Sequence, residues 1–124
     1  MEKDCFGCSS GERFVVRRDG LATFTLTGKA RHRTEDQSSV GRVSSEDFEA
    51  LARLTLAQGF WELQDLYEDP QIRDGAWTLI TVERKGAAPK QVFRREAEGP
   101  AALAEIAAAI EALRTRITLE RKHP

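Results

Sequence analysis

The stretch VSSEDFEALARLTLAQGFWELQDLY, residues 43 to 67, gives the clearest structural signal in the chain. Ser44 or Ser45 can accept hydrogen bonds from the first free amides of a helix, and the acidic residues that follow suit the positive end of its dipole. Apolar side chains then recur at the spacing of one helix face, at Phe48, Leu51 and Leu54. The stretch predicts a capped amphipathic helix that packs against a core.

An aromatic turn is expected where this helix ends. Gly59 can take a positive φ just past the last turn, and Phe60 and Trp61 follow at once. We expect Phe60 to lie in the core, because the apolar stripe of the helix needs aromatic cover there. Trp61 is a candidate partner-binding residue, since Trp is enriched at interface hot spots.

The length and net charge of the chain limit the classes of protein to which it can belong. A chain of 124 residues with a net charge of -1 predicts one globular domain, which can bury roughly two-thirds of its unfolded surface. No apolar run approaches the roughly 20 residues that span a bilayer, so we expect no membrane-spanning segment. Residues 44 to 76 are acidic and the flanking regions basic. This alternation favours solvated faces over the basic stripe of a nucleic-acid-binding protein, so we expect no nucleic-acid partner.

A hairpin is predicted upstream of the helix. Two strand-like segments, residues 12 to 18 and 21 to 27, flank Asp19-Gly20, a strong turn signal. Phe24 and Leu26 share one face of the second segment and are expected to be buried. The other face is expected to be exposed and is a candidate partner-binding surface; it carries Thr23, Thr25 and Thr27.

The remaining elements complete a fold-class prediction. An edge strand is expected around residues 40 to 43, a second hairpin from residues 76 to 82 and 91 to 93, and a final helix from residue 101 to 117. The order β-β-(β)-α-β-β-α predicts an α+β fold. We expect a single antiparallel twisted sheet of four to five strands, with both helices packed on one face.

The two cysteines, Cys5 and Cys8, lie in a short polar segment near the start of the chain. Their spacing is compatible with a thioredoxin-like redox pair, with half of a zinc site, or with a structural disulfide or two idle thiols. The last interpretation is favoured, because a redox pair normally opens a helix and a zinc site needs further ligands. Residues 1 to 12 are therefore expected to be a flexible segment, 13 to 117 the domain, and 118 to 124 a tail.

Other polar residues give no pattern of catalysis or cofactor binding. His32 lies between two arginines with no nucleophile or carboxylate at a telling distance, which favours an exposed strand residue over a general base. The acidic stretch from residue 62 to 74 lacks the ligand spacing of an EF-hand calcium loop and is read as a solvated rim. We expect no catalytic residues, no cofactor and no metal.

Several motifs together resemble a family of small bacterial domains of unknown function that are often found in lipoproteins and secreted proteins. They are residues 14 to 26, 41 to 48, 59 to 61, 63 to 67 and 74 to 77. The resemblance implies an extracytoplasmic location, secreted or lipid-anchored after loss of a leader. A more distant resemblance is to emfourin-type inhibitors of thermolysin-like metalloproteases, which share the hairpin-helix-hairpin-helix plan.

These resemblances and the small size favour a non-enzymatic protein-binding or inhibitory module whose partner is another protein. The alternatives are an envelope-associated structural or assembly component and, with less support, a thiol-redox enzyme that uses Cys5 and Cys8. The sequence sets neither the partner's identity nor the oligomeric state.

Overall fold

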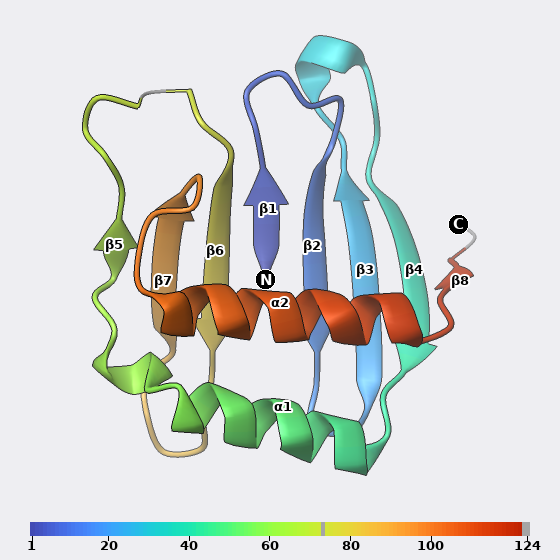
Figure 1. Cartoon of the computed structure of the whole chain (residues 1–124). Helices are drawn as coiled ribbons and strands as arrows, with labels where there is room; N and C mark the ends of the chain where they lie inside the picture. Colours follow the sequence, from blue (N-terminus) through green and yellow to red (C-terminus); the bar gives the residue numbers. More distant parts are fainter. Residues whose placement is uncertain (73, 123–124) are drawn as a thin grey trace.

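The computed structural model describes residues 1–72 and 74–122. Within these residues the chain forms one eight-stranded sheet and two α-helices (Figure 1). The sheet order is β5-β7-β6-β1-β2-β3-β4-β8, and every neighbouring pair is antiparallel except β5 and β7, which are parallel. The strands are β1 (Glu2–Asp4), β2 (Gly11–Val16), β3 (Leu21–Thr27), β4 (Gln37–Arg42), β5 (Leu66–Tyr67), β6 (Trp77–Val82), β7 (Lys90–Arg95) and β8 (Glu120–Arg121).

The predicted sheet of four to five strands, all antiparallel, is therefore wrong. Three short strands were not anticipated, β1, β5 and β8, and they change both the element order and the pairing. Two of them are only two residues long, too short to show a period-two pattern in the sequence. The α+β class and the dominance of antiparallel pairing are confirmed.

The N-terminal segment lies in the middle of the sheet rather than free in solvent. β1 pairs with β2 through Glu2 and Lys3, and with β6 through Glu2, Lys3 and Asp4. Met1 extends this pairing, because its ammonium donates to the Phe14 carbonyl at 2.7 Å. Burial of that ammonium lowers its pKa. The expected flexible segment at residues 1 to 12 is thus corrected, since β1 joins the two halves of the sheet.

The C-terminal segment is also part of the sheet. β8 pairs with β4 at Ser39 and Val40, so β4 is not the edge strand that the sequence predicted. The chain approaches β4 closely here, and a Cβ on Gly41 would meet the carbonyl of Thr118. The expected tail at residues 118 to 124 is therefore corrected over its described part, and residues 123 and 124 lie outside the described residues.

The hairpin of β2 and β3 forms as predicted around Asp19-Gly20. Gly20 has a φ of 90°, and the Asp19 carboxylate accepts a hydrogen bond from the Leu21 amide. Arg17 N–H donates to the Leu21 carbonyl at 2.9 Å, which closes the turn. A glycine in this left-handed conformation is typical of short hairpin loops because it lacks a Cβ.

The first helix, α1 (Ser45–Ala57), begins and ends as its local signals require. Ser44 is the N-cap, and its hydroxyl accepts from the Asp47 amide at 3.1 Å. Gly59, with a φ of 73°, opens the short 3-10 helix η2 (Phe60–Glu62). Phe60 is fully buried, so its predicted core role is confirmed.

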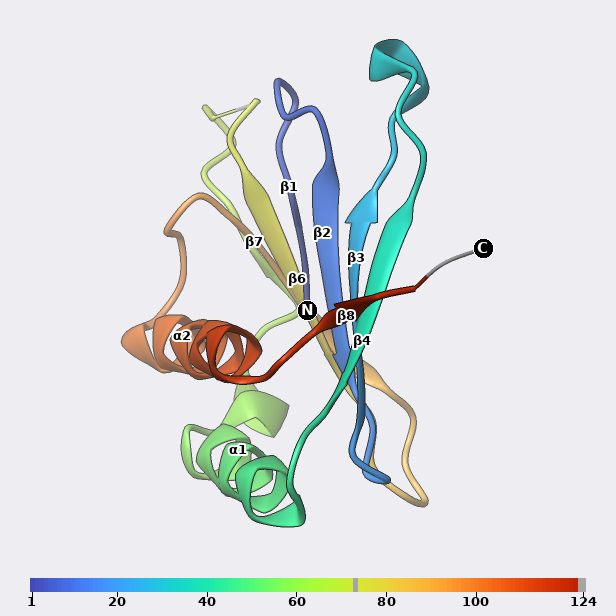
Figure 2. The same cartoon turned by 90° about the vertical axis from the view of Figure 1, so that its right-hand side faces the viewer.

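Both helices lie on the same side of the sheet, as the side view shows (Figure 2). The second helix, α2 (Ala101–Arg116), crosses most of the strands and buries Leu103, Ile106 and Leu113. The core between helices and sheet has two clusters. One gathers around Phe60, Ile80 and Val92. The other gathers around Phe14, Ala22 and Val43.

A small polar network ties α2 to the central strands. Lys3 Nζ lies 3.4 Å from Glu111 of α2 and 3.5 Å from Glu12 of β2. Glu111 also pairs with Arg114, whose guanidinium lies over the Phe24 ring. The hydrogen bond from Arg114, with a smaller contribution from the charge of Lys3, lowers the pKa of Glu111. β1 is therefore connected to the helix layer as well as to its neighbouring strands.

Candidate functional site

The two faces of the sheet differ in what covers them. Phe14 and Phe24 pack into the core under the helices, so their strand neighbours must point to the opposite side. Ile80 and Val92 do the same on the other half of the sheet. The opposite side carries no helix (Figure 2). We call it the open face, made up of Glu2, Asp4, Arg13, Val15, Thr23, Thr25, Thr27, Ser38, Val40, Trp77, Leu79, Thr81, Gln91, Phe93 and Arg95.

An aromatic pair lies on the open face where β6 meets β7. The rings of Trp77 and Phe93 are stacked, with centroids 5.7 Å apart and planes 24° from parallel. Arg95 lies beside them, its guanidinium carbon 5.3 Å from the Phe93 centroid. The same guanidinium donates to the Gly75 carbonyl and pairs with Glu68, so it is held in place. A fixed Trp-Phe-Arg group of this kind combines the residue types that dominate protein interfaces.

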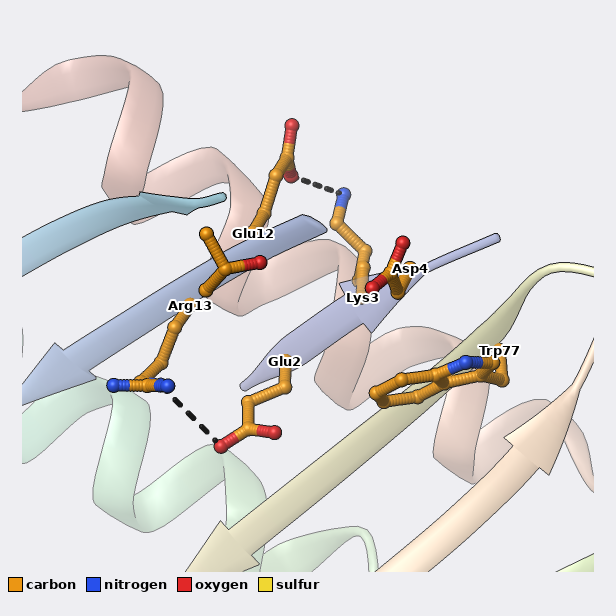
Figure 3. Close-up of a pocket in the computed structure, with 7 residues that line it drawn as sticks. Glu2, Lys3, Asp4, Glu12, Arg13 and Trp77 are labelled. Atoms are coloured by element: carbon orange, nitrogen blue, oxygen red, sulfur yellow. Dashed lines mark ion pairs between the residues drawn. The ribbon is translucent and has the colours of Figure 1, made fainter. Parts of the chain in front are cut away.

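Charged side chains of β1 and β2 continue the open face next to the aromatic pair. Glu2 pairs with Arg13 at 3.5 Å, and Asp4 pairs with Lys29 at 2.7 Å. Figure 3 shows Glu2 and Arg13 turned toward each other, with the Trp77 ring nearby. These groups line a hollow together with Thr27 and with Lys3 and Glu12, whose side chains belong to the helix side of the sheet. Each of the two carboxylates, Glu2 and Asp4, has a cationic partner.

The predicted threonine surface is only partly exposed. Thr23, Thr25 and Thr27 do share the face away from the helices, but Thr25 is 6% exposed. Its neighbours in the sheet are Arg13 and Ser38, and its hydroxyl lies 3.0 Å from that of Ser38. Directly opposed side chains are about 5 Å apart, so a short residue in a central strand is covered from both sides. The expectation of exposure is wrong at Thr25.

The exposure of the other residues on this strand also differs in degree from the prediction. Thr23 and Thr27 are half-buried, and the Thr27 hydroxyl accepts a hydrogen bond from the Gly11 amide at 3.1 Å. Phe24 and Leu26 are half-buried as well, although Phe24 contacts the core as expected. The alternation was therefore predictable, whereas the burial of each residue depended on its cross-strand neighbours.

Trp61 lies away from the open face, next to α1. Its ring makes an edge-to-face contact with Phe60, with centroids 6.1 Å apart. The guanidinium of Arg84, from the turn after β6, stacks over the ring at 4.0 Å. Trp61 is half-buried in these intramolecular contacts. The structure thus separates it from the threonines, with which the sequence analysis had grouped it.

Cys5 and Cys8 form a disulfide across the turn between β1 and β2. Neither residue lies at the start of a helix, where a dipole would lower the pKa of a thiol. The turn is linked to the loop after β3, because Lys29 Nζ donates to the Cys5 carbonyl and Arg31 donates to that of Phe6. The disulfide therefore sits in a turn that is fastened by side chains from another loop.

The other polar residues considered as candidate site residues lie in separate parts of the structure. His32 lies in the exposed turn η1 (Ala30–His32) rather than in a strand. In the acidic stretch, Asp65 pairs with Lys90 and Glu68 with Arg95. Within residues 1–72 and 74–122, no group of three or more His, Cys, Asp or Glu side chains could hold a metal ion.

Comparison of the chain with protein-family models, with curated proteins and with solved structures found no match. The resemblances drawn from the motifs stay predictions. In the part of the chain that the structure describes, neither helix has the length and apolar character needed to cross a membrane.

Sequence reasoning missed the residues that make the open face distinctive. It predicted a hairpin from residues 76 to 82 and 91 to 93, but it did not pair Trp77 with Phe93. The signal available was an aromatic residue on each of two strands predicted to form a hairpin. Glu2 and Arg13 gave no comparable signal, because their pairing depends on β1 entering the sheet.

Proposed function

We propose that the protein is a non-enzymatic protein-binding or inhibitory module that contacts its partner through the open face. The observation that carries this proposal is an eight-stranded sheet with helices on one side only and a stacked Trp77–Phe93 pair on the other. Aromatic residues and Arg beside a polar rim are the usual composition of an interface centre. An extracytoplasmic location is proposed with it, from the resemblance alone.

The edges of the sheet support the face as the contact surface. The outermost strands, β5 and β8, are each two residues long. Short edge strands are a common way to prevent pairing with other chains. A partner that adds a strand directly to β5 or β8 would find few free hydrogen-bonding groups, so the open face offers the larger area.

A cross-linking experiment tests this function. A photoreactive amino acid replaces Val15, which is 44% exposed on the open face, and the protein is irradiated in extract from its native source. The matched control carries the same group at Leu56, which is 63% exposed on α1. We expect one dominant protein adduct from position 15 and none of that mass from position 56. Equal cross-linking at both positions would contradict the proposal.

The identity of the adduct separates the alternatives. A protease would favour the inhibitory module, and loss of its activity on titration with this protein would establish inhibition. An envelope component would favour the assembly role. A thiol-redox enzyme would instead require turnover of Cys5 and Cys8, and a variant with both changed to Ser would then lose its function while still cross-linking from position 15.

A further inference from the structure

At one end of the hollow on the open face, a glycine lets two side-chain oxygens approach each other. Gly11 of β2 is buried and lies opposite Thr27 of β3. A Cβ placed on Gly11 would lie 2.7 Å from Asp4 Oδ2 and 2.6 Å from Thr27 Oγ1. Both Asp4 and Thr27 line the hollow. A carboxylate oxygen and a hydroxyl oxygen therefore converge there, above a residue that has no side chain of its own.

Two carboxylates of β1 retain hydrogen-bonding capacity in this hollow. Asp4 Oδ1 accepts from the Cys5 amide and lies 2.7 Å from Nζ of Lys29, which does not line the hollow. Asp4 Oδ2 accepts no hydrogen bond from residues 1–72 and 74–122. Glu2 lies 3.5 Å from Arg13, longer than the roughly 2.7–3.2 Å of an N–H···O hydrogen bond, and its side chain is 43% exposed. Both carboxylates can therefore accept hydrogen bonds from a group that enters the hollow.

An aromatic ring lies beside these carboxylates. Trp77 is directly opposite Asp4 in the sheet, and its ring lies next to Glu2 (Figure 3). The ring stacks with Phe93, and the residue is half-buried, so part of the indole is accessible from the hollow. A Lys or Arg cation close to a Trp ring is attracted by its π-electrons. The hollow thus combines two carboxylates with the aromatic side chain that attracts cations most strongly.

The charges that line the hollow also favour a cation. Five charged residues line it, and two of them, Lys3 and Glu12, pair with each other on the helix side of the sheet. The other three are two carboxylates and one cation, Glu2, Asp4 and Arg13. A cationic group of a partner would therefore complement the open side of the hollow, and complementary charge across an interface provides specificity.

The size of the hollow and the spacing of its carboxylates suit one arginine side chain. Its volume is about 200 Å³, below the roughly 300–1,000 Å³ of pockets that take drug-sized ligands. Glu2 and Asp4 are two residues apart on one strand, so their Cα atoms are about 7 Å apart. A planar guanidinium has five N–H donors, so it can donate to both carboxylates and stack on an aromatic ring. An ammonium is a compact, strongly hydrated charge and suits this arrangement less well.

We propose that the hollow binds an arginine side chain of the partner protein, with its guanidinium between Glu2 and Asp4 and against the Trp77 ring. The proposal rests on the function proposed above and adds the chemistry that the partner presents to the open face. Arg13 competes with the incoming guanidinium for Glu2. Removal of Arg13 should therefore strengthen binding, which a purely structural role of these residues would not produce.

Short peptides test the hollow directly. Acetyl-Gly-Arg-Gly-amide is titrated into the isotope-labelled 124-residue chain and followed by NMR. We expect saturable shifts of the Trp77 indole N–H and of the side-chain carboxyl carbons of Glu2 and Asp4. A peptide with citrulline in place of arginine has nearly the same shape without the charge and should bind at least fivefold more weakly. No saturable shift at these three residues at millimolar peptide, or equal binding of the two peptides, would overturn the proposal.

Matched variants separate the hollow from a general attraction of cations to the protein. Glu2→Gln should weaken binding of the arginine peptide at least fivefold. Glu105→Gln removes the same charge from an exposed position on α2 and should leave binding unchanged. Arg13→Gln should strengthen binding. Equal affinities of Glu2→Gln and Glu105→Gln would overturn the proposal, and the citrulline peptide, which is used with the unchanged protein, is independent of any folding defect.

Cross-linking at position 15 tests the open face as a whole and does not depend on arginine. An adduct specific to position 15, without binding of the arginine peptide, would overturn this inference and leave the proposed function standing. Binding of the peptide in the hollow, with equal cross-linking from positions 15 and 56, would support the arginine site and contradict the proposed function.

Discussion

At the scale of single residues, Phe60 anchors the turn that follows α1. Its ring is fully buried, contacts Trp61 edge-to-face and lies in the cluster with Ile80 and Val92. Gly59 allows the chain to turn sharply enough to bring this ring under the helix, because its φ of 73° has no Cβ penalty. The position is therefore structural, and the half-buried Trp61 covers it.

Replacing Phe60 with Ala should destabilise the protein strongly. Loss of a buried Phe costs about 3–5 kcal/mol, because apolar contacts are lost and a cavity remains. The free energy of unfolding is measured by urea titration. Phe6→Ala is the control, since Phe6 is 65% exposed and a surface change typically costs at most about 0.5 kcal/mol. Equal unfolding midpoints for the two variants would show that Phe60 is not a core residue.

At the scale of elements, β1 is the strand on which the sheet depends. In the sheet of the described residues, β6 and β7 are hydrogen-bonded to β2 and β3 only by way of β1. Glu2 and Lys3 pair on both sides and Asp4 pairs with β6, and Lys3 adds contacts to Glu12 and Glu111. A strand placed between two others in this way cannot be removed without exposing the backbone of both.

Lys3→Pro should therefore be far more harmful than Lys3→Ala. Proline removes the amide that faces β2 and leaves a buried carbonyl without a donor, which costs about 1–3 kcal/mol before any steric clash. Alanine removes only partly exposed ion pairs, each worth about 0.2–1 kcal/mol. Thermal unfolding followed by circular dichroism compares them. If both variants melt together with the parent, residues 1 to 12 are a tether after all.

At the scale of the whole molecule, the fold is one sheet with one layer of helices. The layers share the two core clusters and the polar network of Lys3, Glu12, Glu111 and Arg114. In that network, the charge state of a side chain affects how strongly the helix layer and the sheet are held together. The other face of the sheet carries no helix (Figure 2).

The pH dependence of stability should reveal this network. The pKa of Glu111 is lowered below 4.5 in the fold, so the unfolded chain binds more protons between the folded pKa and 4.5. Its contribution is complete above pH 4.5 and is lost as the pH falls through the folded pKa. Glu111→Gln should cost about 0.2–1 kcal/mol at neutral pH, as for an exposed pair, and should converge with the parent in acid.

Chemical unfolding at a series of pH values measures this difference. Glu105→Gln is the matched control on the same helix, because Glu105 is exposed and a surface change typically costs at most about 0.5 kcal/mol. A gap between Glu111→Gln and the parent that is constant from neutral to acid pH would mean that the carboxylate charge contributes nothing to the layer contact.

The elements whose signals are local were predictable from the sequence alone. Four features depend on residues that are only a few positions apart, so each could be predicted from the sequence. They are the Ser44 cap, the Gly59 turn, the Asp19-Gly20 hairpin and the apolar stripe of α2. The α+β class followed from their order. Thr25 shows the limit, since its side of the strand was predictable but its burial was not.

The pairing of strands across long stretches of chain depends on tertiary contacts. β1 pairs with β6, with Glu2 opposite Leu79, and β8 pairs with β4, with Glu120 opposite Val40. Segments of two or three residues carry no periodic pattern, and their pairing is stabilised only by backbone groups that distant strands leave free. The pairing of Glu2 with Arg13 on the open face arises from those long-range contacts, which is why it was not visible in the sequence.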